Sequence, residues 1–331
     1  MTDALLLDDL FQQILLKPAF NGANEIFIVS GYASFLMASH HIEKLNKKDI
    51  KINLIVGMTS RDGLSRTNHQ GFKSLMTDSL NGRFNCSYVV NRPPIHSKVY
   101  SWTQSGKPLI GFTGSANYSQ QAFISKKQGE IITQCNPDMA YEYYQSLISD
   151  SIFCTHQDAD FVIDIYKEYQ RNETELKEAL EQSNQIDGLE KVQVSLLSKK
   201  AGYIVPPKSG LNWGYAAPRN KNDSKPRERN DAYIHLSPKV YKSDFFPRRG
   251  IHFSVTTDNG IVLICKRAQK TGEGHAIETP SRNSELGEYF RNRLGLSNGQ
   301  LITKEHLINY GRTDVDFYKI DENSYYMDFS V

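Results

Sequence analysis

The sequence of 331 residues contains little that would place it in a membrane or around a structural metal. No apolar run approaches the roughly 18 residues that a membrane-spanning helix needs, and residues 1–9 lack the basic start of a secretory signal. The chain has no CxxC pair, and its cysteines are scattered at Cys86, Cys135, Cys154 and Cys265. Such cysteines predict reduced thiols of a cytoplasmic protein rather than a disulfide framework or a zinc site.

The net charge of +2 conceals two halves of opposite sign. Residues 190–331 hold 22 Lys and Arg against 16 Asp and Glu (+6), which leaves 17 against 21 (−4) for residues 1–189. The chain is long enough for two domains that each bury a core. A basic half beside an acidic half indicates that one domain meets a polyanion, although surfaces that bind nothing often carry as much charge.

Short apolar runs alternate with stretches of helical spacing in the first half of the chain. Strands are expected at 25–30, 51–57, 86–90, 97–102, 108–112 and 130–134, and helices at 34–45, 70–81, 137–151 and 159–183. This alternation predicts an α/β domain over residues 1–183, with a mixed sheet flanked by helices.

The composition changes after residue 183. A polar stretch at 184–191 suits a short linker. Beyond it, strand-like runs at 232–236, 251–256, 260–266 and 325–329 are separated by polar loops, and one helix is expected at 284–294. Residues 192–331 are therefore predicted to form a mostly β domain, either a barrel or a sandwich.

One segment of the first half carries chemistry. It reads Ile95-His96-Ser97-Lys98, and Gly114-Ser115-Ala116-Asn117 follows it. On a strand, His96 and Lys98 would point to the same face, and the small residues near Asn117 would let backbone approach a phosphate. A histidine that attacks phosphorus needs a nearby cation and hydrogen-bond donors for the charge on the phosphoryl oxygens. His96, Lys98 and Asn117 supply these parts without a metal or cofactor.

This pattern resembles the phospholipase D superfamily, whose motif is HxK followed by a small-residue segment that ends in Asn. The resemblance implies that His96 forms a phosphohistidine, that Lys98 and Asn117 hold the phosphate, and that Ser115 assists. The superfamily's Asp, five residues after the Lys, is replaced here by Thr103. Glu130 is the candidate for the missing carboxylate. A solvated Glu130 and a Ser115 that only fits a tight turn are the structural alternatives.

HxK occurs once in the chain, whereas superfamily chemistry uses two such motifs that face each other. One histidine attacks and the other protonates the leaving group. A chain with a single copy is therefore expected to form a homodimer with one site shared across a two-fold axis.

Two basic loops of the second half are candidates for binding double-stranded DNA. Arg and Asn pair with base edges, whereas Lys and scattered Arg hold phosphates. The candidate residues are Trp213, Arg219, Asn220, Lys221, Arg227, Lys270, Arg282 and Asn283. The alternative is a pair of solvated surface loops, which are polar and basic by default.

Several stretches of the second half look like the C-terminal domain of NgoFVII-type restriction endonucleases. They are residues 210–214, 232–234, 244–247, 286–294, 310–315 and 325–330. The resemblance implies a B3-like pseudobarrel that grips the major groove with two loops called arms. These map onto roughly residues 213–230 and 266–283.

Together the two resemblances imply a type II restriction endonuclease that hydrolyses specific double-stranded DNA without a metal. The family also implies a cognate methyltransferase, and some relatives depend on a helicase-like ATPase partner. This chain has no GxxxxGK[ST] loop, so ATP would be used only by such a partner. Two alternatives remain at this point: a phospholipase-D-type lipid phosphodiesterase, and a DNA-binding regulator with an inactive nuclease domain.

Overall fold

The computed structural model describes residues 5–45, 49–77, 82–125, 129–166, 189–216, 227–268, 274–280 and 282–331. The chain divides into two compact units, residues 1–178 and 179–331, and each is described by itself. The predicted linker at 184–191 falls largely outside the described residues and stays a prediction. In the described ranges, no helix combines the length and the apolar character that crossing a bilayer requires.

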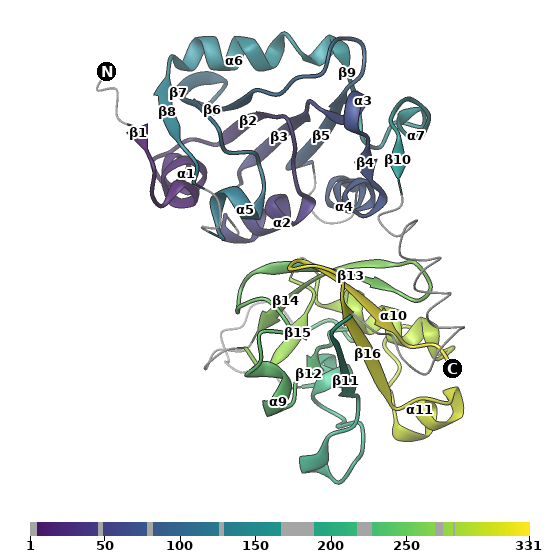
Figure 1. Ribbon diagram of the computed structural model, residues 1–331. Coiled ribbons are helices and arrows are strands. Elements are labelled where there is room, and N and C mark those ends of the chain that lie inside the picture. Colours follow the sequence, from purple (N-terminus) through teal and green to yellow (C-terminus); the bar gives the residue numbers. More distant parts are fainter. Residues whose placement is uncertain are drawn as a thin grey trace. The chain divides into compact units, whose positions relative to one another are not determined.

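An eight-stranded mixed sheet forms the centre of the first unit (Figure 1). Its order is β1-β8-β7-β6-β2-β3-β5-β9; β2, β3 and β5 are parallel, and the remaining neighbours are antiparallel. The strands are β1 (Leu5–Leu6), β2 (Glu25–Ser30), β3 (Lys51–Val56), β5 (Phe84–Val89), β6 (Lys98–Gln104), β7 (Lys107–Gly114), β8 (Ile132–Cys135) and β9 (Ser151–Phe153). A separate pair, β4 (Leu64–Ser65) and β10 (Ile165–Tyr166), is parallel.

Helices cover both faces of this sheet (Figure 1). On one face, α6 (Pro137–Gln145) packs against β2, β6 and β7. The opposite face is covered by α2 (Phe35–Lys44) and α4 (Arg66–Thr77). The shorter helices are η1 (Phe11–Leu16), α1 (Lys17–Phe20), α3 (Thr59–Asp62), α5 (Gln120–Phe123), η2 (Ile148–Asp150) and α7 (Ala159–Val162). Because β2 and β3 are buried on both faces, their sequences are nearly continuous apolar runs. The predicted α/β class is confirmed.

Two predicted helices are wrong in length. The helix expected at 137–151 ends at Gln145, and the chain then forms η2 and the edge strand β9, which pairs with β5. The helix expected at 159–183 ends at Val162, because Ile163 adopts an extended conformation (φ −112°, ψ 134°) and leads into β10. There the amide of Leu64 donates to the carbonyl of Asp164 at 2.8 Å, so pairing with distant residues replaces local helix formation. Residues 167–183 lie outside the described ranges.

The second unit is a nearly closed β-barrel (Figure 1). Its order is β11-β16-β17-β13-β14-β15-β12, with β13 and β17 parallel and the other neighbours antiparallel. A cavity of about 310 Å³ is lined by residues of both end strands, including Val194 and Ile234. The strands are β11 (Lys191–Ser195), β12 (Ile234–His235), β13 (His252–Thr257), β14 (Val262–Ala268), β15 (Ala276–Glu278), β16 (Asp314–Lys319) and β17 (Ser324–Asp328).

The barrel encloses an aromatic core that includes Phe253, Phe290 and Tyr325, each 1% exposed or less. Against it pack α10 (Ser284–Arg293) and α11 (Lys304–Tyr310), while η3 (Lys199–Ala201), η4 (Gly210–Tyr215) and α9 (Pro238–Tyr241) lie in the connections. Of the two predicted architectures, the barrel is confirmed. Strand β16 went unpredicted because Asp314 and Asp316 interrupt its apolar pattern.

Candidate active site

His96 lies just before β6 and contacts Lys98, the first residue of that strand. The Lys98 Nζ is 3.1 Å from His96 Nδ1 and 3.2 Å from Nε2, and it donates to the His96 carbonyl oxygen at 2.7 Å. His96 is exposed, whereas Lys98 is only 7% exposed. The prediction that both stand on a strand is wrong, since β6 begins at Lys98 and His96 precedes it. Their adjacency comes from the lysine folding back toward the imidazole.

The environment of Lys98 is that of a buried cation. Burial removes water from its ammonium group and lowers the pKa of Lys98, while the charge of Glu130 acts in the opposite direction. A cation with little solvent screening interacts strongly with a nearby anion. A phosphate that reaches the exposed imidazole of His96 would therefore lie close to this ammonium group.

The segment that carries His96 is fixed by close approach to two glycines. The amide of Ile95 donates to the Gly57 carbonyl at 2.9 Å. A Cβ atom at position 57 would lie 2.1 Å from the Ile95 carbonyl oxygen, and one at position 31 would lie 3.0 Å from His96 Cδ2. Both positions follow parallel strands, β2 and β3, whose ends meet at the same edge of the sheet. The site is thus built where the chain passes against glycine backbone.

Asn117 is held by the end of β2. Its Oδ1 accepts a hydrogen bond from the Tyr32 amide at 3.1 Å and lies 3.4 Å from Ser30 Oγ. Ser30 is opposite Lys98 in the register of β2 and β6, and its Oγ also accepts from the Tyr118 amide at 2.9 Å. With its carbonyl end engaged, the amide side chain of Asn117 is oriented with Nδ2 as its donating end.

Ser115 and Glu130 form a second pair beside Lys98. Ser115 Oγ donates to Glu130 Oε2 and accepts from the Ile131 amide at 3.0 Å. Glu130 was expected to begin a strand, but β8 starts at Ile132. Among the described residues, the hydrogen bond of Glu130 goes to Ser115 rather than to His96, so its role as an orienting carboxylate stays a prediction. Thr103 lies near the other end of β6, fully buried and opposite Glu25.

The structure adds Tyr32 and Asp62, which the sequence analysis did not identify. The Tyr32 ring lies edge-on to the His96 imidazole, with a centroid distance of 5.7 Å and an interplanar angle of 79°. Its hydroxyl donates to Asp62 Oδ2 at 2.5 Å. Neither residue belongs to a recognisable motif. The sequence signal that could have identified them is their position after β2 and β3, two neighbouring buried parallel strands, at the edge of the sheet where polar side chains gather.

In the second unit, two of the predicted DNA-binding residues hold the base of the first arm. The Arg227 guanidinium lies 4.9 Å from the centroid of the Trp213 ring and donates to the Ala216 carbonyl at 2.8 Å. Arg229 lies 4.5 Å from the Tyr215 ring in the same way. These contacts join the two ends of the loop between residues 216 and 227.

The predicted residues near α10 also have partners within the unit. Arg282 donates to Ser284 Oγ at 2.9 Å and to the Glu288 carboxylate, which raises the pKa of Arg282. The backbone carbonyl of Asn283 accepts from the Ala232 amide at 3.2 Å, whereas its side-chain Oδ1 is buried without a hydrogen-bond partner among the described residues. The remaining predicted residues, Arg219, Asn220, Lys221 and Lys270, lie outside the described ranges. Direct contacts of all these residues with DNA stay predictions.

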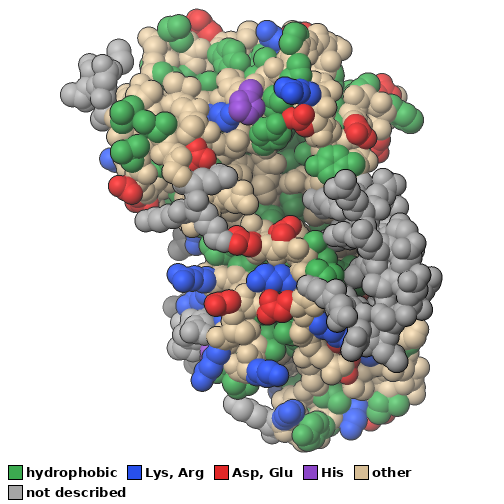
Figure 2. All heavy atoms as spheres, viewed as in Figure 1, with side chains coloured by type: hydrophobic (Ala, Val, Ile, Leu, Met, Phe, Trp, Pro, Cys, Tyr) green, Lys and Arg blue, Asp and Glu red, His purple; other side chains and the backbone are tan. Residues whose placement is uncertain are grey.

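Buried arginines support both loops. Arg291 is fully buried and donates to the carbonyls of Leu211 and Arg229, which lie near the two ends of the first arm. Arg267 is 4% exposed and donates to the Gly274 carbonyl at 3.1 Å, across the base of the second arm. On the face drawn in Figure 2, basic side chains are spread over the second unit with acidic side chains between them. The described residues of the barrel thus hold the ends of both loops through hydrogen bonds of buried arginines.

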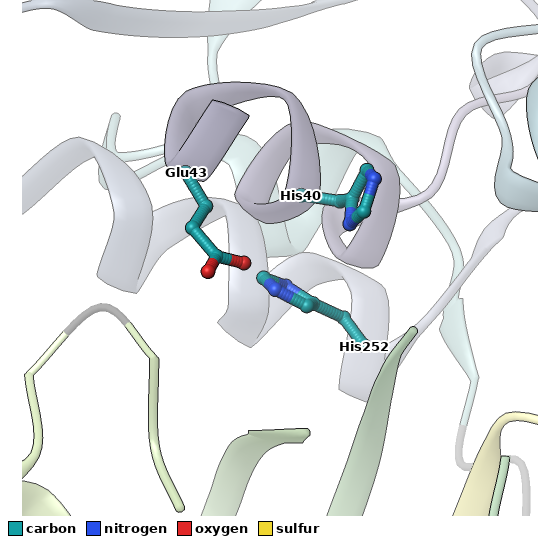
Figure 3. Close-up of side chains that lie close together, drawn as sticks. All are labelled: His40, Glu43 and His252. Carbon is teal, nitrogen blue, oxygen red and sulfur yellow. The ribbon is translucent and has the colours of Figure 1, made fainter. Parts of the chain in front are cut away.

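Helix α2 carries two side chains that could bind a metal ion. His40 and Glu43 lie one turn apart on α2, and His252, the third side chain in Figure 3, begins β13 of the other unit. A catalytic zinc ion is typically bound by three protein side chains. Two ligands from one unit do not make such a site.

Comparison with known proteins matches one family domain to each of the two units. Residues 8–160 match the model of the NgoFVII restriction endonuclease N-terminal PLD domain, and residues 184–321 match that of the NgoFVII C-terminal B3-like DNA-binding domain. The sequence comparison with curated proteins gives no match.

Solved structures give weaker likenesses. NucT from Helicobacter pylori is 17% identical, with a TM-score of 0.33, covering 46% of this chain and 98% of its own. Nuc from Salmonella typhimurium, a phospholipase D family member, is 14% identical, with a TM-score of 0.32, covering 42% of this chain and 87% of its own. Likeness at this level carries no argument about activity.

Proposed function

Because this chain belongs to the NgoFVII restriction endonuclease family, we propose that it cleaves double-stranded DNA at specific sequences, without a metal ion, through a phosphohistidine at His96. The observation that carries the proposal is the contact of 3.1 Å between the Lys98 ammonium and the His96 imidazole. It joins a nucleophile to a phosphate-binding cation in the PLD domain, and the B3-like domain provides the means to find DNA.

The residues support the following reaction. His96 attacks phosphorus, so that an N–P bond forms while the P–O bond to the departing strand breaks. The leaving oxygen takes a proton from His96 of a second copy of the chain. Water then gives a proton to that second histidine and attacks phosphorus, which breaks the N–P bond and releases His96. Lys98, Ser115 and Asn117 stabilise the charge on the phosphoryl oxygens in both steps.

The homodimer in this proposal rests on the single HxK motif. A cytoplasmic restriction enzyme also requires a cognate methyltransferase that protects the cell's own sites. A helicase-like ATPase is a further proposed partner. Since the chain has no GxxxxGK[ST] loop, that partner would be the protein that hydrolyses ATP.

We expect DNA cleavage to continue in excess EDTA, because imidazole, ammonium and carboxamide groups supply the nucleophile and the charge stabilisation. The measurement is conversion of supercoiled plasmid to nicked and linear forms, followed by sequencing of the ends. Discrete, repeated ends are the expected result.

Three other outcomes would contradict the proposal in different ways. Loss of cutting on chelation, restored by Mg²⁺, would disprove the metal-independent mechanism. Tight sequence-specific binding without any cutting would favour the inactive-nuclease regulator. Release of choline from phosphatidylcholine vesicles, with DNA left intact, would favour the lipid phosphodiesterase.

Replacing Trp213 with alanine is expected to weaken DNA binding about tenfold, or about 1.4 kcal/mol. The substitution removes the ring against which Arg227 packs and so loosens the base of the first arm. Fluorescence anisotropy with cognate DNA measures the change. Ile308→Ala is the control, since Ile308 is 54% exposed on α11 of the same unit. Equal affinities of the Trp213→Ala variant and the control would show that the arm base has no role.

A further inference from the structure

Tyr32 is a partly exposed aromatic residue whose backbone is fixed on both sides. It lies between β2 and α2 and is 44% exposed. Its amide donates to Asn117 Oδ1 at 3.1 Å, and its carbonyl accepts from Ser30 Oγ at 2.5 Å. The next residue, Ala33, forms a parallel bridge with Tyr118. The chain at Tyr32 is therefore tied directly to the segment that carries Asn117.

The side chain of Tyr32 is fixed as well. Its hydroxyl donates to Asp62 Oδ2 at 2.5 Å, and Asp62 lies at the end of α3, which follows β3. Arg61 Nε is 3.6 Å from Asp62 Oδ1. The hydrogen bond to Asp62 raises the pKa of the Tyr32 phenol, so the hydroxyl stays protonated as the donor. A ring held at both its backbone and its hydroxyl has little freedom to rotate.

This fixed ring is one wall of the space around the His96 imidazole. The two rings meet edge to face, at 5.7 Å between centroids and 79° between planes. On another side, the Gly31 backbone approaches so closely that an added Cβ would lie 3.0 Å from His96 Cδ2. His96 is exposed, so without these two contacts its imidazole would be surrounded by water and free to change rotamer.

The contribution of these contacts to folding is small. A hydrogen bond between exposed groups contributes little because both groups are equally well solvated in the unfolded chain. Orientation of a nucleophile is different, since a displacement of about 1 Å in a reacting group can reduce a rate by about 10²-fold. The geometry of Tyr32 therefore matters more for catalysis than for stability.

We propose that Tyr32, locked by Asp62, is a positioning residue that holds the His96 imidazole in the orientation for attack on phosphorus. It acts through His96 and forms no bond with the substrate. Through its amide it also sets the orientation of Asn117, so one residue coordinates the nucleophile with a phosphate-binding group. The inference rests on the proposed nuclease function and names a component of that site which the HxK and Asn motifs do not include.

The test uses the full chain and compares four variants in single-turnover cleavage of cognate DNA. Tyr32→Ala removes the wall and is expected to lower the cleavage rate by about 10- to 100-fold. Tyr32→Phe keeps the ring but loses the hydrogen bond to Asp62, so its rate should lie between those of Tyr32→Ala and the wild type. Asp62→Ala should resemble Tyr32→Phe, and the double variant should be no worse than either single one, because both remove the same hydrogen bond. DNA affinity and the melting temperature should stay at the wild-type values.

Tyr166→Ala is the matched control, since Tyr166 is also 44% exposed in the same unit but packs beside Gly63 rather than against His96. A wild-type rate for Tyr32→Ala, or a loss shared with Tyr166→Ala, would overturn the inference. A loss of DNA affinity equal to the loss of rate would also overturn it, because Tyr32 would then be a substrate contact. Undiminished cleavage by a His96→Ala variant would instead disprove the proposed function itself.

Discussion

Replacing His96 with alanine is expected to reduce DNA cleavage by about 10⁴-fold or more, which corresponds to about 5 kcal/mol of activation free energy. The substitution removes the only nitrogen nucleophile that adjoins Lys98 in the described site, so no phosphohistidine forms. DNA affinity should be retained, because the B3-like domain is a separate compact unit. The measurements are single-turnover cleavage, equilibrium binding of the same DNA and acid-labile labelling of the protein with a phosphate-labelled substrate.

His156→Ala is the matched control for this variant. His156 belongs to the same unit, and its side chain is 48% exposed with Asp158 as its neighbour. The control should cleave and form the labelled intermediate as the wild type does. A His96→Ala variant that still cleaves at a wild-type rate would remove His96 from the reaction and end the proposed mechanism.

The elements that could be predicted from the sequence are those whose pattern is local. Strands β2 and β3 were placed almost to the residue, because strands that are buried on both faces are continuous apolar runs. Helix α2 was equally clear, since Ser34 caps it by accepting from the Leu36 amide. The HxK motif was visible because His96 and Lys98 lie only two residues apart and the segment that ends in Asn117 follows closely in the chain.

The features that were missed depend on contacts between distant segments. No periodicity near Ile163 indicates that the chain leaves its helix to pair with β4. His96 was treated as part of a strand because it directly precedes the strand expected at 97–102. In the structure Ile95 approaches Gly57 closely, and β6 begins only at Lys98. The position of Tyr32 after β2 was the only signal for it in the sequence, because its partners are 30 to 85 residues away.

Asn117 is expected to contribute about 10²- to 10³-fold to the cleavage rate, or about 3 to 4 kcal/mol, as a donor to a phosphoryl oxygen. Its Oδ1 accepts from the Tyr32 amide, whereas its Nδ2 is the end that would donate to phosphate. Substitutions can therefore test the two ends of the side chain separately. Asn117→Ala removes both the Oδ1 acceptor and the Nδ2 donor. Asn117→Asp keeps an acceptor for the Tyr32 amide but replaces the donor with a negative charge that repels phosphate.

If Asn117 acts on phosphate, the aspartate variant should be as slow as the alanine variant or slower, with both affecting kcat rather than KM. If it only holds the Tyr32 backbone, aspartate should restore the rate, and the assignment would be wrong. Asn136→Asp provides the control, because Asn136 Oδ1 caps α6 by accepting from the Met139 amide at 3.0 Å and aspartate caps equally well. A normal rate for this control, together with a slow Asn117→Asp variant, would assign the loss to the donor that faces phosphate.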